Sequence, residues 1–536
     1  MSNLSKHNTK SFIIHPILFS IYPIIFIFSQ NIHLLPVTEI FLPILTMISL
    51  TIFTLFILGK KIRNRNKIAL VISLLVLVFF SYGHVYNILN DSELENSEIS
   101  RHRYLLIPFS VIAILGTIFF LKSKKKFNNA TTIANGISAS VIVLISINIV
   151  GDFSSGNYFG NPELAENETW FGIGAPQENS MMNIFSTSIE ENLLENQLDR
   201  NKNFPDVYYI ILDEYPSNES SKKFYEFDNS KFLTSLENSG FYVVKNSFSN
   251  YPMTIQSLSS SLNMEYLDVL TTDVDKNSQN YRFLNKLLSD NIVMQKFSSL
   301  KYEIINVGSL WGPNGEFKNA KTNFCEFKEI NFDSLIRELL EKSMISYFYE
   351  KHFEQLRRDQ IMCGFNEFSN LSQNTDQPKF VFVHILLPHA PYIFGPNGEH
   401  VSSGNSLNSE PWNERVAYVN QIKFLNKNLI EKIIPELLNS DNKPIIILQG
   451  DTGGGHSIDW KEPTREMVFE RMANLNVVYF PDGNYEDLYE DITPVNTFRI
   501  IFNKYFNGDY ELHIDKNFWS DGEKPYDYKN ISETLK

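Results

Sequence analysis

The sequence has few cysteines and few clusters of basic residues. The chain has 536 residues and two cysteines, Cys325 and Cys363, and neither stands in a CxxC or Cys/His pattern. A structural zinc finger is therefore excluded, whereas one disulfide and two buried thiols both remain compatible with the pair. The net charge is -14, and basic residues are dense only in two short loops, which excludes nucleic acid as a partner.

Long apolar runs dominate the first 150 residues. A bilayer-spanning helix needs roughly 20 such residues, and five runs approach that length, at residues 12–29, 39–59, 68–89, 104–121 and 130–150. No small-residue cleavage site follows the first run, so we interpret it as an anchor rather than a cleaved signal peptide. Residues 1–150 are predicted to be an all-α bundle of about five transmembrane helices.

The loops between these runs predict the orientation of the chain in the membrane. Lys and Arg near helix ends stay on the cytoplasmic side. They are dense at residues 60–67 and 122–126, two spans apart, whereas the loop at residues 91–103 is mixed and mildly acidic. The sequence therefore predicts a multi-pass protein of the cell membrane with a cytoplasmic N-terminus. An odd number of spans places everything after Val150 on the extracytoplasmic side, which excludes ATP-dependent kinase chemistry.

The rest of the chain reads as a linker followed by one globular domain. Residues 151–204 are polar and irregular and are predicted to form an extracytoplasmic linker. Residues 205–536 alternate between strands and helices. Runs at 207–212, 380–387 and 444–448 are apolar on both faces, which is typical of interior strands of a parallel sheet. Amphipathic helices are expected at 331–353 and 410–438.

Reactive side chains follow the predicted strands. Asp213 follows the first strand, His389 follows the second in LPHAP, and Asp451 follows the third in QGDTGGGH. Because ligands of such sheets bind beyond the carboxyl ends of the strands, these residues are candidates for a divalent-metal or substrate site. Each Asp alone is equally typical of a turn or helix cap. Thr254 opens a helix-compatible stretch after Pro252, where a hydroxyl is either a nucleophile or an ordinary N-cap.

Five ordered segments carry a resemblance to a known family. They are PDVYYIILDEY, NYPMTIQSLSSSLNMEYL, FVFVHILLPHAPY, PIIILQGDTGG and DITPVNTFR. Together they resemble the signature segments of membrane-bound sulfatase-like hydrolases and transferases of the alkaline phosphatase superfamily, over residues 205–506. The five-span anchor with an external domain is similar to lipoteichoic acid synthases. The resemblance implies an α/β fold, an alkaline-phosphatase-like sandwich with a mixed, mainly parallel sheet.

The resemblance also implies roles for single residues. By likeness to the family, Thr254 is the catalytic nucleophile and a metal ligand, Asp213 and Asp451 are metal ligands, and His389 and Trp311 contact the substrate. The metal would be one divalent ion, Mn, Mg or Zn. The family has histidine after the second aspartate, whereas this chain has Thr452. Either His456 replaces that imidazole in the metal site, or the site is weak or absent.

Phosphate esters are favoured over sulfate esters as substrates. The sulfatases of this superfamily modify a Cys or Ser in a Cys/Ser-x-Pro-x-Arg sequence, and neither cysteine nor Thr254 is followed by that pattern. An unmodified threonine suits a covalent phosphoryl intermediate. We therefore expect a metal-dependent phosphotransferase or hydrolase that acts on a membrane lipid or envelope glycan at the bilayer. The alternative is a catalytically degenerate sulfatase-like domain that binds an envelope ligand or scaffolds membrane partners.

Overall fold

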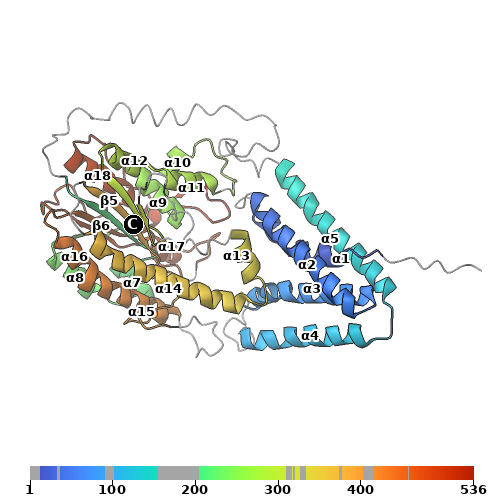
Figure 1. Ribbon diagram of the computed structural model, residues 1–536. Helices are drawn as coiled ribbons and strands as arrows, with labels where there is room; N and C mark the ends of the chain where they lie inside the picture. The colour runs from blue at the N-terminus through green and yellow to red at the C-terminus, as the bar shows by residue number, and fades with distance from the viewer. Residues whose placement is uncertain are drawn as a thin grey trace, which may run out of the picture. The chain divides into compact units, whose positions relative to one another are not determined.

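The structure is a computed structural model, and its described residues divide into two units (Figure 1). The membrane unit contains helices α1–α5, helix α13 and the start of helix α14 as far as Phe353; the catalytic unit contains the remaining elements. The described residues are 12–32, 37–90, 102–154, 204–279, 281–309, 317, 320, 322–325, 334–372, 377–401, 414–456 and 458–535. Trp311 and nearly all of the predicted linker lie outside these ranges.

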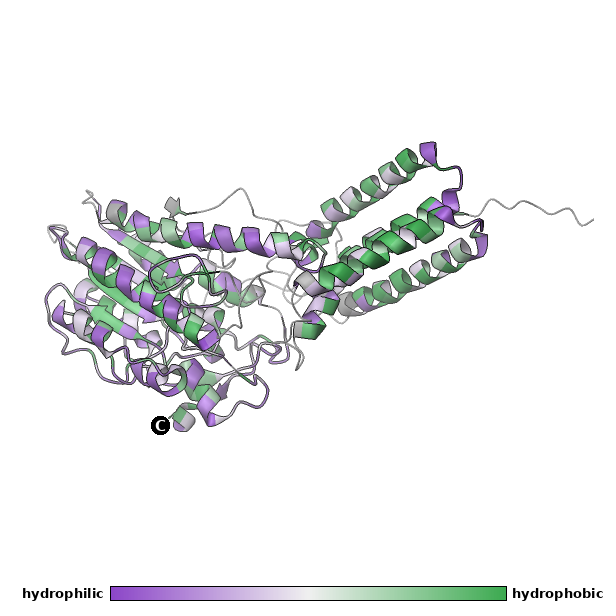
Figure 2. Cartoon of the chain, turned by 90° about the horizontal axis from the view of Figure 1, so that it is seen from below, coloured by the Kyte–Doolittle hydropathy of each residue, from purple (hydrophilic) through white to green (hydrophobic). Residues whose placement is uncertain are grey.

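Apolar helices build the membrane unit. Apolar residues dominate them in Figure 2, and large side chains such as Leu115, which is 60% exposed, cover their surfaces. Four are long and apolar enough to cross a membrane, whereas α1, with 16 residues, is shorter than the predicted first span. The helices are α1 (His15–Gln30), the short 3-10 helix η1 (Val37–Ile40), α2 (Phe41–Lys61), α3 (Arg65–Asn90), α4 (His102–Lys122) and α5 (Asn128–Ser154).

The helix expected at residues 331–353 is two helices, α13 (Ser334–Glu341) and α14 (Ser346–Leu371). The prediction of one continuous helix was wrong because the backbone leaves the helical path between them. There Met344 N donates to Phe79 O of α3 at 2.9 Å, and Ser343 Oγ accepts from Ile345 N at 3.3 Å. The periodicity of a sequence does not predict such a long-range backbone contact.

A seven-stranded sheet forms the centre of the catalytic unit, in the order β2-β7-β6-β1-β5-β3-β4. Strands β1, β3, β4, β5 and β6 run parallel to one another, and β7 pairs antiparallel with both β6 and β2, which confirms the expected mixed, mainly parallel sheet. The strands are β1 (Val207–Leu212), β2 (Tyr242–Val243), β3 (Glu303–Val307), β4 (Thr322–Phe324), β5 (Lys379–Ile385), β6 (Ile445–Gly450) and β7 (Asn476–Tyr479). A small second sheet pairs β8 (Phe518–Trp519) with β9 (Lys529–Asn530).

Helices cover both faces of the large sheet, as Figure 1 shows. Alternate side chains of β1 enter two separate cores: Tyr208 and Ile210 pack with α14 and α15, and Tyr209 and Ile211 pack with α9, α12 and α18. The fold is therefore a three-layer α/β sandwich. The helices are α7 (Asn218–Tyr225), α8 (Ser230–Asn238), α9 (Thr254–Asn263), α10 (Leu267–Leu270), α11 (Arg282–Ser289), α12 (Ile292–Ser299), α15 (Glu414–Asn428), the π-helix η6 (Leu429–Ile433), α16 (Ile434–Leu438), α17 (Arg465–Met472), α18 (Pro494–Phe506) and α19 (Ser532–Leu535).

The two cysteines are joined. Cys325, directly after β4, forms a disulfide with Cys363 of α14, 38 residues further along the chain. Of the two alternatives left by the sequence, the structure has the disulfide. Because disulfides persist in oxidising compartments, this bond agrees with an extracytoplasmic catalytic unit.

Candidate functional site

Three side chains converge where the central strands end. Leu212 of β1 is in register with Gly450 of β6, so the next residues, Asp213 and Asp451, lie side by side. His384 of β5 is in register with Ile211, two residues before Asp213, and therefore lies on the same face of the sheet. One carboxylate oxygen each from Asp213 and Asp451 and one ring nitrogen of His384 all lie within 4.8 Å of one another.

This group fits a divalent cation. Asp213, His384 and Asp451 are all buried, and His384 Nε2 lies 3.9 Å from Asp213 Oδ2. Among the described residues, no donor hydrogen-bonds to Asp213 Oδ1 or Asp451 Oδ2. Buried carboxylate oxygens without a donor are costly unless a cation satisfies them. Two carboxylates and an imidazole form a donor set that Zn and Mn accept.

Burial sets the protonation of these groups. Burial, with the Glu214 charge as a second cause, raises the pKa of Asp213 to about 7. Burial, followed by the Asp213 charge, raises the pKa of Asp451 to about 7 as well. Burial lowers the pKa of His384 to about 3, so its imidazole is neutral at physiological pH. A neutral imidazole is the form that binds metals.

Thr254 begins helix α9 beside this group. The N-cap residue is Met253, so the alternative interpretation of Thr254 as an N-cap was wrong. Burial raises the pKa of Asp451, and the neighbouring Thr254 side chain opposes that rise. The position at the helix start exposes the hydroxyl to the positive end of the helix dipole. Thr254 thus lies near Asp451, and its roles as nucleophile and metal ligand stay predictions.

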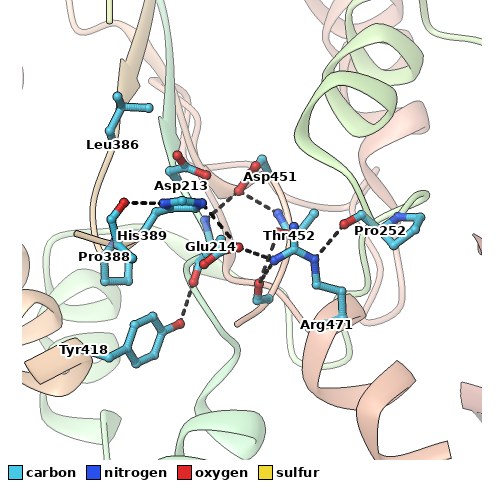
Figure 3. A network of polar contacts seen from close by, with 12 residues as sticks. Asp213, Glu214, Pro252, Leu386, Pro388, His389, Tyr418, Asp451, Thr452 and Arg471 are labelled. Atoms are coloured by element: carbon cyan, nitrogen blue, oxygen red, sulfur yellow. Dashed lines mark hydrogen bonds and ion pairs between the residues drawn. The ribbon is translucent and has the colours of Figure 1, made fainter. Parts of the chain in front are cut away.

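Glu214 and Arg471 form a buried ion pair next to the metal-capable group (Figure 3). Arg471 Nη1 donates to Glu214 Oε1, and Arg471 Nε donates to Pro252 O at 2.6 Å, directly before α9. Glu214 N donates to Asp451 Oδ1 at 2.8 Å. Burial opposes ionisation of Glu214, but the His389 and Arg471 charges outweigh it and lower the pKa of this carboxyl. The pair therefore fixes the segments that carry Asp451 and Thr254.

His389 projects from the loop after β5 with 42% of its side chain exposed. Its Nδ1 lies 2.6 Å from Ala390 O, so this nitrogen carries a proton and donates it. Its Nε2 lies 3.7 Å from Glu214 Oε1. The backbone of the loop is held by Arg357, whose Nη2 donates to Leu386 O at 2.8 Å and to His389 O at 3.2 Å.

An open cleft of about 1210 Å³ joins these residues to the surface. Thr254, His389, Glu214 and Arg471 all line it, which gives a substrate access to the hydroxyl and the imidazole together. Its other lining residues are Met253, Ile255, Gly455, His456, Ile458, Asp459, Trp460, Lys461, Met467, Asp521, Gly522 and Glu523.

Thr452 adjoins the metal-capable group through its backbone, because Thr452 N donates to Asp451 Oδ1 at 2.8 Å. Thr452 is fully buried, and its hydroxyl donates to Gly453 O at 3.1 Å. His456 Nδ1 lies 3.3 Å from Glu414 Oε2, at the cleft wall. His384 supplies the only imidazole of the group among the described residues. A metal-ligand role for His456 stays a prediction.

The glycines before His456 serve packing rather than unusual backbone angles. None of Gly453, Gly454 and Gly455 has a positive φ. A Cβ on Gly453 would meet Glu470 O at 2.3 Å, and one on Gly454 would meet Tyr225 Oη at 2.1 Å. The missing side chains of Gly453 and Gly454 therefore leave room for the Glu470 backbone and for the Tyr225 hydroxyl.

Sequence reasoning missed three residues of this site: His384, Glu214 and Arg471. His384 had a signal, since it is the one ionisable residue inside an apolar strand run, FVFVHILL. The signal for Glu214 was its position directly after Asp213 in the sequence. Arg471 had no signal, because it lies near the C-terminal end of helix α17, far along the chain from the end of β6.

A comparison with models of known protein families assigns the chain to a family. The model of the Sulfatase family matches residues 205–504, more than half of the chain, and the chain belongs to this family. It is accordingly a sulfatase-like enzyme, and its apolar helices make it a membrane protein. No curated protein matches the sequence.

Solved structures offer more distant likenesses. The C-terminal periplasmic domain of EcEptC from Escherichia coli is 10% identical, with a TM-score of 0.40 over 62% of this chain and 94% of that chain. Lipooligosaccharide phosphoethanolamine transferase A from Neisseria meningitidis, an integral membrane protein, is 13% identical, with a TM-score of 0.36 over 90% and 92% of the two chains. The phosphonate monoester hydrolase of Agrobacterium radiobacter is 13% identical, with a TM-score of 0.37 over 59% and 80%. These likenesses are too weak to transfer a substrate to this chain.

Proposed function

We propose that this protein transfers or hydrolyses phosphate-ester groups of envelope lipids or glycans, with Thr254 as the nucleophile. One observation carries the proposal: Thr254 lines the cleft and also neighbours Asp451, a member of the metal-capable group. A hydroxyl that is both reachable by substrate and adjacent to a cation site is what nucleophilic phosphoryl transfer requires.

Asp213, Asp451 and His384 are the residues proposed to hold one divalent ion, with the Thr254 oxygen as a further ligand. When bound, such an ion lowers the pKa of a hydroxyl and offsets phosphate charge. This assignment changes the predicted ligand set in one respect. His384 supplies the nitrogen that the family's pattern places at position 452, so Thr452 does not by itself make the site degenerate.

The chemistry proceeds in two balanced steps. Thr254 Oγ attacks phosphorus and loses its proton to water in the cleft, the P–O bond to the leaving alcohol breaks, and the leaving oxygen takes a proton from His389. The hydroxyl of an acceptor, or water, then attacks the phosphothreonine and gives its proton to His389, while the P–O bond to Thr254 breaks and the threonine oxygen takes a proton from water. His389 is the proposed proton donor to the leaving oxygen, because its imidazole lines the same cleft and its Nε2 faces Glu214.

The substrates are expected at the membrane surface. The catalytic unit follows the last apolar helix, α5, which in turn follows the basic loop at residues 122–126. If basic loops stay inside, the catalytic unit is extracytoplasmic whether or not the short helix α1 spans. Donors within reach are then phospholipids, and acceptors are envelope glycans, polyol polymers or water.

The proposal is tested with the full chain in liposomes. Thr254→Ala removes the nucleophile and should abolish turnover of a radiolabelled phospholipid donor, whereas Thr254→Ser retains a hydroxyl and part of the activity. Without an acceptor, the label should accumulate on the wild-type chain and be absent from Thr254→Ala. The exposed Thr272→Ala is the matched control and should behave as wild type.

Two outcomes would contradict the proposal. Turnover retained in Thr254→Ala would exclude the threonine as nucleophile. Cleavage of an aryl sulfate but not of an aryl phosphodiester would exclude phosphate esters as the substrate class.

A further inference from the structure

The corner between α13 and α14, residues 342–346, is bonded to a membrane helix through its backbone. Gly83 N of α3 donates to Lys342 O at 3.2 Å, and Met344 N donates to Phe79 O of α3 at 2.9 Å. In sequence the corner lies between strands β4 and β5 of the catalytic sheet, yet it belongs to the membrane unit. The chain therefore returns to the membrane helices in the middle of its catalytic half.

Gly83 provides the space for this contact. A Cβ at this position would lie 2.4 Å from Lys342 Cα and 2.6 Å from Lys342 C, both backbone atoms that cannot turn aside. Packing continues along α13, where Leu335 and Leu339 are buried with Ile24 and Phe28 of α1. The corner and α13 are thus fitted to the helices α1 and α3.

The first turns of α14 are anchored as well. Glu350 Oε2 lies 3.2 Å from Nε2 of His102, the first residue of α4, and His102 Nδ1 lies 2.8 Å from Tyr82 Oη of α3. The end of α3 and the start of α4 belong to the same membrane face, because the chain connects them directly. Helix α14 therefore begins at that face.

The contact on α3 lies within the length of the membrane span. The span runs from Arg65 to Leu89, and Gly83 and Phe79 precede Leu89 by six and ten residues. At ~1.5 Å per residue these positions are ~9 and ~15 Å from the end of the span, within a hydrocarbon core that is ~30 Å thick. The corner is then at the depth of the acyl chains.

The hydrogen bonds of the corner suit that depth. Each backbone N–H from Lys342 to Ser346 has an acceptor within the protein: Glu338 O, Leu340 O, Phe79 O, Ser343 Oγ and Ser343 O, in chain order. Irregular backbone is tolerated inside a bilayer only when protein satisfies its polar groups, whereas a loop in water has no such need.

We propose that this corner is embedded in the extracytoplasmic leaflet, with Ile345 and Phe348 in contact with lipid acyl chains. Their side chains are 41% and 66% exposed in the described structure, while Lys342 O and Met344 N of the corner bond to α3. Ile345 and Phe348 form an apolar surface next to helices whose own exposed side chains are apolar. Lipid acyl chains therefore cover the corner and these helices as one continuous apolar surface. The partner is a lipid surface, and the proposal is independent of the role of Thr254.

The test places a fluorescent label at the corner of the full chain in liposomes. Ile345→Cys and Phe348→Cys are labelled separately, and the native cysteines do not react because they form a disulfide. Labels at both positions should be quenched by acyl-chain nitroxide lipids as strongly as one at Leu115→Cys in α4, which is 60% exposed. Quenching by aqueous iodide should be several-fold weaker than at the exposed Glu237→Cys of the catalytic unit.

A second variant checks the contact itself. Gly83→Leu should expel the corner and shift the label at Phe348→Cys toward the values of Glu237→Cys, while the label at Leu115→Cys stays quenched by lipid and reports normal insertion. Iodide quenching at Ile345 and Phe348 equal to that at Glu237 in the otherwise native chain would overturn the proposal. Protection from both quenchers would also overturn it, because protein would then cover these residues in place of lipid.

Discussion

Asp213 and Asp451 lie side by side because each directly follows one of the registered residues Leu212 and Gly450, at the ends of neighbouring parallel strands. They are 238 positions apart in the sequence, yet the register alone sets their proximity. Burial raises the pKa of Asp451, and the neighbouring Asp213 charge raises it further. A cation between the two carboxylates opposes both effects, which is the physical basis of the predictions below.

The first prediction concerns the proposed metal ligands. His384→Ala and Asp451→Asn should each lower the metal content of the purified full chain, with affinity reduced by at least ~10-fold, since even partners one step removed from a metal contribute 10- to 100-fold. His456→Ala should leave the metal content unchanged, because His456 pairs with Glu414. Elemental analysis after dialysis measures the three variants. Metal loss in His456→Ala together with full retention in His384→Ala would reverse the assignment.

The second prediction concerns pH and the stability of the metal-free chain. Burial raises the pKa of Asp213 and Asp451 from an ordinary 3.8 to about 7, so the folded state binds protons that the unfolded state releases. Their contribution to stability is therefore fully present below pH ~4 and is lost as pH rises through ~7. Thermal unfolding of chelated protein should show Asp451→Asn more stable than wild type at pH 8, by on the order of a few kcal/mol, and nearly equal to it at pH 4.

Exposed Asp509→Asn is the control for that measurement and should change stability at neither pH. Added metal should make wild type the more stable of the two chains at pH 8, because Asp451→Asn cannot gain the stabilisation that ion binding gives to wild type. An Asp451→Asn chain less stable than wild type even after chelation would show that Asp451 is stabilised by partners other than a cation.

Much of the fold could be predicted from sequence because its strands are buried on both faces. The run at 207–212 matches β1 exactly in its bounds, and Asp213 and Asp451 follow from the rule that ligands gather beyond strand ends. His384 escaped that rule because it lies inside β5, two positions before the level of Asp213. The break between α13 and α14 was unpredictable, since it is set by backbone contacts with Phe79, more than 250 residues earlier.

The third prediction concerns the close packing around Gly453. Gly453→Ala should destabilise the chain by ~1–3 kcal/mol, because its Cβ would press on two carbonyl oxygens, Glu470 O at 2.3 Å and Ala473 O at 2.7 Å. It should also weaken metal binding, since Gly453 follows Asp451 by two residues. The matched control is Gly364→Ala in α14, where the nearest atom is Val307 Cγ1 at 3.8 Å. That change should stabilise the chain by up to ~1 kcal/mol through helix propensity. Equal effects of the two changes on the thermal midpoint would contradict the packing argument.

The last prediction concerns membrane topology and separates the role of α1 from that of the other helices. A reporter active only outside the cytoplasm should be active after Lys536 and inactive within residues 63–66, because the two basic loops are expected inside. Both results are independent of α1, since α2 to α5 already alternate sides from the loop at residues 60–67. The N-terminus depends on α1, whose 16 residues extend ~24 Å, less than the ~30 Å of a hydrocarbon core.

The loop charges predict a cytoplasmic N-terminus, which requires α1 to cross the membrane together with its apolar flank at residues 12–14. In right-side-out vesicles, protection of an N-terminal epitope tag from added protease would show that the N-terminus is cytoplasmic. An external N-terminus would leave the catalytic unit outside but reduce the bundle to four spans. An inactive yet stably inserted reporter after Lys536 would instead move the catalytic unit to the cytoplasm, and with it exclude envelope glycans as acceptors for the Thr254 chemistry.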